Sequence, residues 1–362
     1  MIPLLQRLGY RPYSVVWELT LACDLNCRHC GSRAGRARPD ELSTPEALRL
    51  CEELVALGAR RVTLAGGEPT LRRDWPMIAG ALTGKGVKVN ILTNGRSWDA
   101  DKARMVKLYG LTNVAFSLDG CELTHEYVRR VEGQWEHLLR CIDLTRAAGV
   151  EVAVVTTLNR RNLAELDRLR AVLAAHDVAA WQLQLGNPTG NMGDHRDLVL
   201  QPEDMLEVVP RVAALKQLPG RPLVFAADNI GYYGEPEAVL RDRSEVVPFW
   251  VGCRAGCHVL GIESNGNVKG CLSLPSELNG EDRFVEGNVR QRSLTEIWKD
   301  PNAFAYNRQF TVEQLSGFCR TCAYAEICRG GCGWTSFAHV GTTGGNPYCY
   351  HRQVEERAAK AR

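Results

Sequence analysis

Three cysteines, Cys23, Cys27 and Cys30, stand near the start of the chain with the spacing C-x3-C-x2-C. They come just after residues 15–20, whose β-branched and aromatic side chains predict a strand. Three thiolates on one loop can hold three corners of a four-iron cluster, because cysteine thiolates are the usual ligands of iron–sulfur clusters. The fourth iron would then be open to another ligand. A zinc-binding loop or three reduced thiols are the alternatives that this spacing leaves open.

A second group of cysteines lies between residue 251 and the end of the chain. Its pattern is C-x3-C-x8-G-x4-C, then C-x2-C-x5-C-x3-C, then one more cysteine. The members are Cys253, Cys257, Cys271, Cys319, Cys322, Cys328, Cys332 and Cys349. Clustered thiols in a long chain without a secretion signal favour metal binding over disulfides. Because this segment is rich in loops and has little core of its own, bound metal clusters would also stabilise its fold.

The elements that position the first cysteines alternate between strands and helices. A helix is predicted to begin at Ser43, because Glu46 follows three positions later and Pro45 lies in the first turn. Strands are predicted at residues 15–20, 62–65, 87–93, 113–118, 150–158 and 181–185. This alternation predicts an α/β fold with a parallel sheet. Six units are fewer than the eight of a closed barrel, so we expect an incomplete (β/α)6 barrel; a doubly wound sheet is the alternative.

Three segments are predicted along the chain. Residues 1–195 carry the partial barrel, residues 196–250 form a proline-rich connector, and residues 251–362 form a loop-rich α+β domain stapled by iron–sulfur clusters. Short helices are expected in the third segment at residues 294–299 and 301–306. The loop at residues 184–191 follows the sixth strand, at the carboxyl edge where α/β active sites gather. A cofactor-facing role and a plain turn are both open for this loop.

The composition excludes several classes of protein. The 362 residues carry 44 Lys and Arg against 42 Asp and Glu, so no broad basic surface for nucleic acid is expected. No apolar run reaches the roughly 18 residues of a membrane span, and no signal peptide is predicted. The 14 cysteines therefore indicate a cytoplasmic metalloprotein. Cys51 and Cys141 are expected to be buried packing residues, and Cys121 is either packing or a hydrogen-atom donor.

The first cysteine motif, with His29 before its last cysteine, resembles the signature of the radical SAM superfamily. The resemblance implies that Cys23, Cys27 and Cys30 hold a 4Fe–4S cluster whose open iron binds S-adenosylmethionine. It also implies that the reduced cluster cleaves this cofactor to a 5′-deoxyadenosyl radical, which abstracts a hydrogen atom from the substrate.

The same resemblance extends to the ends of later predicted strands. Gly66-Gly67-Glu68-Pro69 follows the second strand and is similar to the family's motif for the methionine end of the cofactor. Further cofactor contacts are implied at Thr93, Asn94, Ser117 and Asp119. Arg130, or its neighbour Arg129, is implied to pair with the cofactor carboxylate.

The C-terminal cysteines resemble the SPASM extension of radical SAM peptide maturases, which carries two auxiliary 4Fe–4S clusters. The resemblance implies one cluster held by Cys253, Cys257, Cys271 and Cys332, and a second held by Cys319, Cys322, Cys328 and Cys349. The usual SPASM pattern has seven cysteines, and Cys257 is the additional one in this chain. If Cys257 is not a ligand, the first auxiliary cluster has an open iron. Two zinc sites are the alternative for these eight thiols.

The resemblance also implies a class of substrate. Leu272 follows Cys271, where the sulfatase-maturating branch has an aspartate that serves as base, so that chemistry is not expected. We expect a ribosomally made peptide or protein that becomes cross-linked, epimerised or oxidised, with a reducing partner such as flavodoxin or ferredoxin. No leader-binding module is expected before the first strand. A small molecule or tetrapyrrole substrate is one alternative, and a non-catalytic zinc or electron-transfer protein is another.

Overall fold

The computed structural model describes residues 9–242, 248–276 and 283–362, and its strands form one ten-stranded sheet in the order β10-β9-β8-β1-β2-β3-β4-β5-β6-β7. The strands are β1 (Ser14–Thr20), β2 (Arg61–Gly66), β3 (Lys88–Thr93), β4 (Asn113–Ser117), β5 (Glu151–Leu158), β6 (Ala180–Leu185), β7 (Leu223–Ala226), β8 (Val259–Ile262), β9 (Asn267–Lys269) and β10 (Gly287–Asn288).

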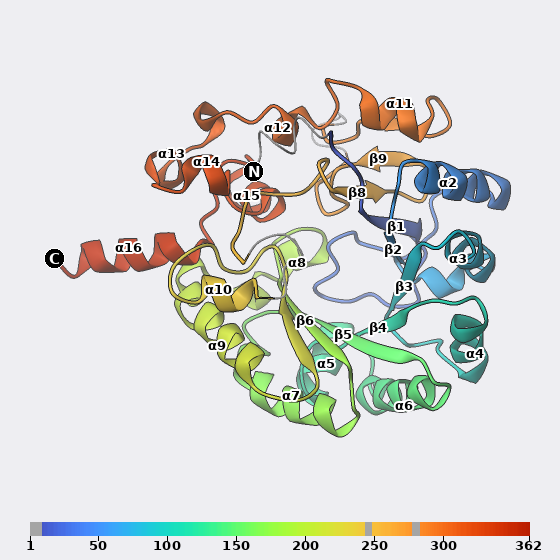
Figure 1. Ribbon diagram of the computed structural model, residues 1–362. Helices are drawn as coiled ribbons and strands as arrows, with labels where there is room; N and C mark the ends of the chain where they lie inside the picture. The colour runs from blue at the N-terminus through green and yellow to red at the C-terminus, as the bar shows by residue number, and fades with distance from the viewer. Residues whose placement is uncertain (1–8, 243–247, 277–282) are drawn as a thin grey trace.

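The strands β1 to β7 pair in parallel, each with the next along the chain. Helices lie on the outer side of this curved sheet, which does not close on itself (Figure 1). A doubly wound sheet would reverse its strand order at a switch point, and this sheet does not. The predicted six β/α units and open barrel are therefore confirmed.

The helices of the barrel half are α2 (Thr44–Ala56), α3 (Trp75–Thr83), α4 (Ala100–Leu108), α5 (Glu122–Arg129), α6 (Gln134–Ala147), α7 (Leu166–Ala175), α8 (Asn191–Asp194), α9 (Met205–Gln217) and α10 (Glu237–Leu240). The start of α2 follows the prediction, since Ser43 and Glu46 form a capping box and Pro45 lies in the first turn. One continuous core joins these helices to the sheet, and Trp17, Phe116 and Trp181 are fully buried in it. Burying each such side chain contributes about 1.5–3 kcal/mol.

The predicted connector at residues 196–250 contains a further β/α unit that the sequence pattern did not predict. Helix α9 packs against β7, and β7 pairs with β6 at the edge of the sheet. Pro210 lies inside α9, and an interior proline normally argues against a helix. The strand β7 has only four residues, which is too short for a clear alternating pattern.

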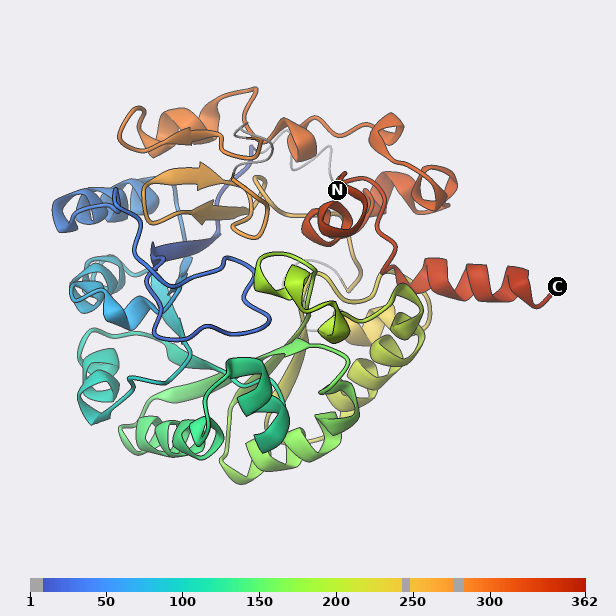
Figure 2. The ribbon, with the colours of Figure 1, turned by 180° about the vertical axis from the view of Figure 1, so that it is seen from behind.

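The C-terminal segment continues the same sheet. Strand β8 pairs in parallel with β1, on the side of β1 opposite β2, and β9 and β10 follow antiparallel. Its helices are α11 (Leu294–Lys299), α12 (Ala305–Arg308), α13 (Phe318–Thr321), α14 (Ala325–Cys328), α15 (Gly333–Val340) and α16 (Tyr350–Lys360). This segment lies over one end of the barrel half, and α16 projects from the body of the protein (Figures 1 and 2).

One of the two short helices predicted for this segment is displaced. The helix expected at residues 301–306 is a turn followed by α12, because Phe304 has a left-handed backbone with φ of 58° and so interrupts helical geometry. The helix predicted at residues 294–299 is α11. Within the described ranges, no helix is both long and apolar enough to cross a membrane.

Candidate active site

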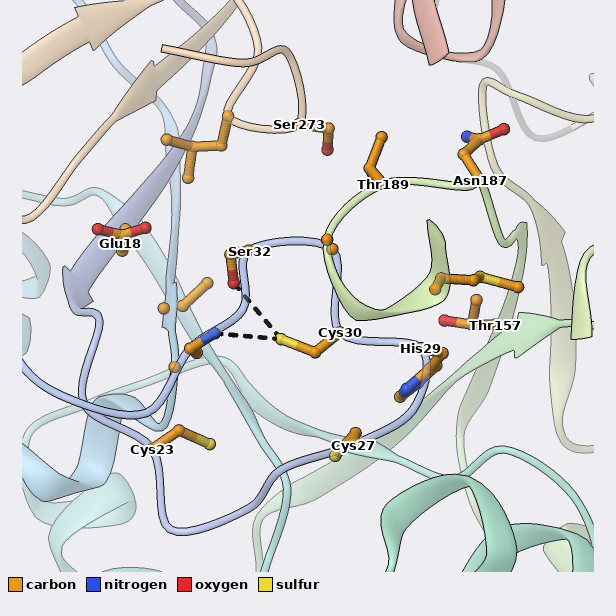
Figure 3. Close-up of a pocket in the computed structure, with 18 of the residues that line it drawn as sticks. Glu18, Cys23, Cys27, His29, Cys30, Ser32, Thr157, Asn187, Thr189 and Ser273 are labelled. Atoms are coloured by element: carbon orange, nitrogen blue, oxygen red, sulfur yellow. Dashed lines mark hydrogen bonds between the residues drawn. The ribbon is translucent and has the colours of Figure 1, made fainter. Parts of the chain in front are cut away.

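A cavity of about 760 Å³ opens at the carboxyl ends of the parallel strands (Figure 3). The three cysteines of the first motif line it, together with Gly66 and Gly67 after β2. The strand ends also contribute Thr93, Asn94, Ser117, Thr157 and Gln184. The sequence left a cofactor-facing role and a plain turn open for the loop after β6, and its Asn187 and Thr189 lie on the cavity wall. The structure therefore brings the predicted motifs to one place.

The cysteine loop is fastened on two sides. On one side, the backbone N–H of Arg28 donates to the carbonyl of Val128 in α5 at 2.9 Å. On the other side, the Asn191 backbone N–H donates to the carbonyl of Cys30 at 2.8 Å, and the Asn191 side chain donates to the carbonyl of Cys27 at 2.9 Å. These bonds fix the path of the loop across the end of the sheet.

The three thiols have hydrogen-bond donors directed at them. The Asn94 amide donates to Cys23 Sγ at 3.7 Å, and the Arg129 guanidinium donates to Cys27 Sγ at 3.7 Å. The backbone N–H of Ala34 donates to Cys30 Sγ at 3.4 Å. Burial raises the pKa of Cys23 to about 11 and also raises that of Cys27, so these two thiols, when free, would stay protonated at neutral pH. Bound iron would keep them as thiolates, and the donors suit that charge.

Close packing explains the glycines of the Gly66-Gly67 turn. A Cβ atom built on Gly67 would lie 2.2 Å from the carbonyl oxygen of Ala22, and one on Gly66 would lie 2.3 Å from that of Thr20. Thr20 is the last residue of β1, and Ala22 belongs to the start of the cysteine loop. Gly190 approaches the other end of the same loop, since its Cβ would lie 2.3 Å from the carbonyl oxygen of Cys30. These glycines therefore let neighbouring segments clamp the loop, in addition to leaving space for a ligand.

Glu68 lies behind the cavity wall rather than on it. Its side chain is fully buried, and its carboxylate accepts hydrogen bonds from the Thr70 hydroxyl at 2.6 Å, the Thr93 hydroxyl at 2.9 Å and the Asn94 backbone N–H at 2.8 Å. Burial raises the pKa of Glu68, and these donors oppose that shift. The residue ties the end of β2 to the end of β3. Direct contact of Glu68 or the buried Pro69 with the cofactor stays a prediction.

Asp119 also organises the wall from behind. It is buried and forms ion pairs with Arg129 Nη2 at 2.6 Å and with His29 Nε2 at 3.0 Å. Burial alone would raise the pKa of Asp119, but the charges of Arg129 and His29 hold it well below its usual range. Arg129 and His29 both line the cavity; His29 belongs to the cysteine loop itself, and Arg129 joins Asp119 to Cys27 of that loop. A carboxylate, an arginine and a cysteine thiol are thus linked in one buried chain.

Of the two adjacent arginines named for the cofactor carboxylate, Arg130 does not line the cavity, and its pairing with the cofactor stays a prediction. Arg129 is the last residue of α5 and is buried against Asp119, whereas Arg130 is the left-handed cap of that helix and is exposed. Adjacent residues on a helix point about 100° apart, so only one of two neighbouring arginines faces the cavity. Arg129, the alternative for the cofactor-pairing role, is the arginine that lines the cavity.

The C-terminal segment supplies the opposite wall of the cavity. Trp334, Phe337 and Ala338 project from one face of α15, and residues 272–276 follow the Cys271 turn. Leu272 is part of this wall, so the position that carries a catalytic aspartate in the sulfatase-maturating branch is apolar here. The aromatic side chains of Trp334 and Phe337 thus face the same cavity as the cysteine loop.

A buried ionic network lies at the junction of the two walls. Arg38 pairs with Glu18 of β1 at 3.1 Å and with Glu263 at 3.7 Å, and Lys269 pairs with Glu263 at 3.3 Å. All four side chains line the cavity. Sequence reasoning missed them, although Glu18 gave one signal as the charged residue within the otherwise uncharged strand VVWELT.

The C-terminal cysteines fall into two sets, and within each set the charge of one cysteine raises the pKa of another. After burial, the charges that most raise the pKa of Cys253 are those of Cys332 and Cys271. Burial, and then the charges of Cys319 and Cys322, raise the pKa of Cys349 to about 12. The second set also includes Cys328, whose pKa is raised by burial and by the other three. Apart from Cys257, each set has the members of one implied ligand group, and the ligand groups themselves stay a prediction.

Cys257 has different neighbours. Its Sγ accepts a hydrogen bond from the Asn307 amide at 3.7 Å, and the charges that act on it are those of Arg308 and Arg329.

A zinc site needs its ligands about 2.3 Å from one ion. In the part of the chain that the structure describes, no three His, Cys, Asp or Glu side chains converge on a single-ion site. An iron–sulfur cluster spreads its thiolates more widely than one ion does.

The three remaining cysteines are packing residues. Cys51 and Cys141 are buried in the core, as predicted, and their thiols donate to the carbonyls of Ile78 and Gly95. Cys121 is buried at the start of α5, and it does not line the cavity. The hydrogen-atom-donor alternative for Cys121 therefore has no support in the geometry.

Comparisons with known proteins agree with this arrangement. The model of the radical SAM superfamily matches residues 17–172, and that of the SPASM iron–sulfur cluster-binding domain matches residues 253–323. AdoMet-dependent heme synthase of Methanosarcina barkeri is 28% identical over 94% of this chain and 97% of that protein. Mycofactocin maturase MftC of Mycobacterium ulcerans is 30% identical over 89% of this chain and 83% of that protein.

A solved structure shares the fold. SuiB of Streptococcus suis, bound to S-adenosylmethionine, matches with a TM-score of 0.72 and 16% identity, over 95% of this chain and 78% of that one. The family matches imply S-adenosylmethionine and iron–sulfur clusters as cofactors, which fits the cysteine groups and the cavity described above. The chain therefore belongs to the radical SAM superfamily and carries a C-terminal SPASM domain.

Proposed function

We propose that this protein is a peptide maturase that takes a hydrogen atom from a residue of a ribosomally made peptide, leading to cross-linking, epimerisation or oxidation. The observation that carries the proposal is one cavity lined by the first cysteine motif on one side and by Leu272, Trp334 and Phe337 on the other. Bound to a 4Fe–4S cluster at Cys23, Cys27 and Cys30, S-adenosylmethionine supplies the 5′-deoxyadenosyl radical on reduction. Flavodoxin or ferredoxin is the proposed class of reductant.

The chain's own residues hold and shield this chemistry. Asn94 and Arg129 donate to two of the three thiols, and Ser117 and Thr93 stand at the strand ends where a nucleoside and an amino acid moiety would lie. The side chains of α15 line the cavity, and exclusion of water there would protect a reactive radical from side reactions. The two C-terminal cysteine sets would hold two auxiliary clusters, which makes three clusters in the proposed protein.

The charge balance of the cavity favours an uncharged substrate group. Among the described residues that line it, the cations Arg38, Lys269 and Arg129 are each paired with an acidic side chain. Glu18 and Glu263 also face the cavity. Glu18 and Glu263 would repel a substrate that bears several carboxylates. A cation that bound such a carboxylate would also have to break its existing ion pair with an acidic side chain. An apolar peptide side chain avoids both costs.

A tetrapyrrole is the second candidate, because relatives named AdoMet-dependent heme synthase match over nearly their whole length. Another relative is named mycofactocin maturase, and SuiB, which shares the fold, has been solved with a precursor peptide. The names alone do not separate the two substrates. The charge balance of the cavity supports the peptide.

The radical chemistry is tested with protein reconstituted anaerobically with iron and sulfide. We expect about 12 irons per chain, as three four-iron clusters require, and formation of 5′-deoxyadenosine when S-adenosylmethionine and dithionite are added. Replacing Cys23, Cys27 and Cys30 together by Ala should abolish that product and leave about eight irons. Retained cleavage in this triple variant would show that the active cluster lies elsewhere.

The substrate is tested by co-expression with candidate precursor peptides encoded near the gene, followed by mass spectrometry. A peptide that loses two hydrogens, or gains solvent deuterium at one residue, only when the intact protein is present would support the proposal. In parallel, iron-coproporphyrin is incubated with the reconstituted protein. Oxidative decarboxylation of the porphyrin, with every peptide unchanged, would favour the tetrapyrrole.

A further inference from the structure

The Tyr306 hydroxyl is a buried polar group without a partner among the described residues. Tyr306 belongs to α12, and its Oη atom makes no hydrogen bond. Its ring packs edge-on against Phe284, with centroids 5.3 Å apart. A buried unpaired hydroxyl costs roughly 1–3 kcal/mol. The neighbouring Asn307 differs, because its amide donates to the carbonyls of Cys253 and Ala255, each at 2.7 Å.

The hydroxyl lies among the cysteines of the first auxiliary set. Tyr306 and Cys253 line one small cavity, together with Gly331 and Gly333 on either side of Cys332. Oη lies 2.2 Å from where a Cβ on Gly270, the residue before Cys271, would be. A phenol has a pKa of about 10 and is protonated at neutral pH, so this hydroxyl is a hydrogen-bond donor.

We propose that the Tyr306 hydroxyl donates a hydrogen bond to the iron–sulfur cluster held by Cys253, Cys271 and Cys332, and so sets its reduction potential. This inference rests on the proposed function, because it requires that cluster. A cluster sulfur supplies the acceptor that the protein lacks. Reduction adds negative charge to the cluster, so a donor stabilises the reduced form and makes the potential more positive. Tyr306 is thus a tuning residue and touches no substrate.

The test uses the full chain with Cys23, Cys27 and Cys30 replaced by Ala, so that the remaining signals come from the C-terminal clusters. Potentiometric titration followed by electron paramagnetic resonance gives their potentials. In Tyr306→Phe, we expect one potential to become more negative and the other to stay. The matched control is Tyr348→Phe, which also removes a buried hydroxyl, one that donates to the carbonyl of Leu200 at 2.5 Å. It should move neither potential.

A second measurement covers the case in which Tyr306→Phe fails to keep its iron. Electron–nuclear double resonance of the reduced, otherwise unsubstituted C-terminal clusters in water and in D2O should reveal an exchangeable proton coupled to one cluster. Absence of that coupling would overturn the hydrogen bond, as would unchanged potentials in Tyr306→Phe with full iron content. A triple variant that binds no iron at all would overturn the auxiliary-cluster assignment, and the hydrogen bond with it.

Discussion

Substitution of Gly67 by Ala tests whether close packing after β2 positions the cysteine loop. The added Cβ would lie 2.2 Å from the carbonyl oxygen of Ala22 and 2.6 Å from that of Leu21, whereas Cβ atoms stay at least 3.0 Å from such atoms. The loop backbone must therefore move by about 0.8 Å. Gly67 has no left-handed φ, unlike Gly66, so the effect of Gly67→Ala is steric alone.

The displacement acts directly on the first cysteine motif, because Ala22 precedes Cys23. Overpacking of this kind costs typically about 1–3 kcal/mol of stability, which a domain of this size tolerates. A misplacement of about 1 Å at reacting groups lowers the rate by roughly 100-fold. We therefore expect folded Gly67→Ala protein that forms 5′-deoxyadenosine roughly 100-fold more slowly.

The assay measures 5′-deoxyadenosine by chromatography, at equal iron content, alongside the urea midpoint of unfolding. Gly35→Ala is the matched control, since Gly35 lies on the same loop and no atom lies within 4 Å of the place that its Cβ would take. It should retain the rate of the unsubstituted protein. A Gly67→Ala protein with an unreduced rate would refute the claim that this contact sets the geometry of the loop.

Three further predictions follow from the buried groups around the cavity and the C-terminal cysteines. Arg129→Ala removes the arginine that pairs with buried Asp119 and should lower the free energy of unfolding by about 3–5 kcal/mol, whereas exposed Arg130→Ala should change it by less than about 0.5 kcal/mol in urea titrations. Burial lowers the pKa of His125 to about 3, so this ring is neutral in the folded protein. The neutral ring therefore makes its full contribution to the free energy of unfolding above about pH 6.5, the pKa of histidine in the unfolded chain. As the pH falls toward 3 that contribution is lost, by up to about 1.4 kcal/mol per pH unit. His125→Asn should flatten the fall of the urea midpoint between about pH 6.5 and 5, and an unchanged slope would contradict this account. Cys271→Ser should lose cluster iron while Cys257→Ser keeps it, and equal losses would place Cys257 among the ligands.

The sequence was sufficient for the features that depend on local pattern. Alternating strands and helices predicted the open barrel, and the spacing of Cys23, Cys27 and Cys30 predicted a shared loop at the carboxyl edge. Both patterns repeat over short distances, so neighbouring residues carry the information. The Ser43 helix start is of the same kind, because capping chemistry involves residues three positions apart.

Features that depend on orientation or on distant contacts were not predictable. The sequence shows two adjacent arginines, and only the rotation of α5 and its end at Arg129 decide which one is buried. The network of Arg38, Glu18 and Glu263 joins residues about 20 and 225 positions apart, beyond the reach of any local pattern. The proline inside α9 argued against a helix at a place where the structure has one, because tertiary packing outweighed the local cost of the proline.

The pairing of β1 with both β2 and β8 bears on how substrate preference is set. Strand β2 leads to the glycine turn that clamps the cysteine loop, and β8 leads through Glu263 to Cys271 and the opposite wall. Glu18 of β1 accepts from Ser264 at 2.8 Å, and Arg38 bridges Glu18 and Glu263. The β2 side and the β8 side of the cavity are thus joined through β1 in one hydrogen-bonded sheet. We therefore expect the side chains of the C-terminal wall, rather than movement between domains, to select the substrate that the cavity binds.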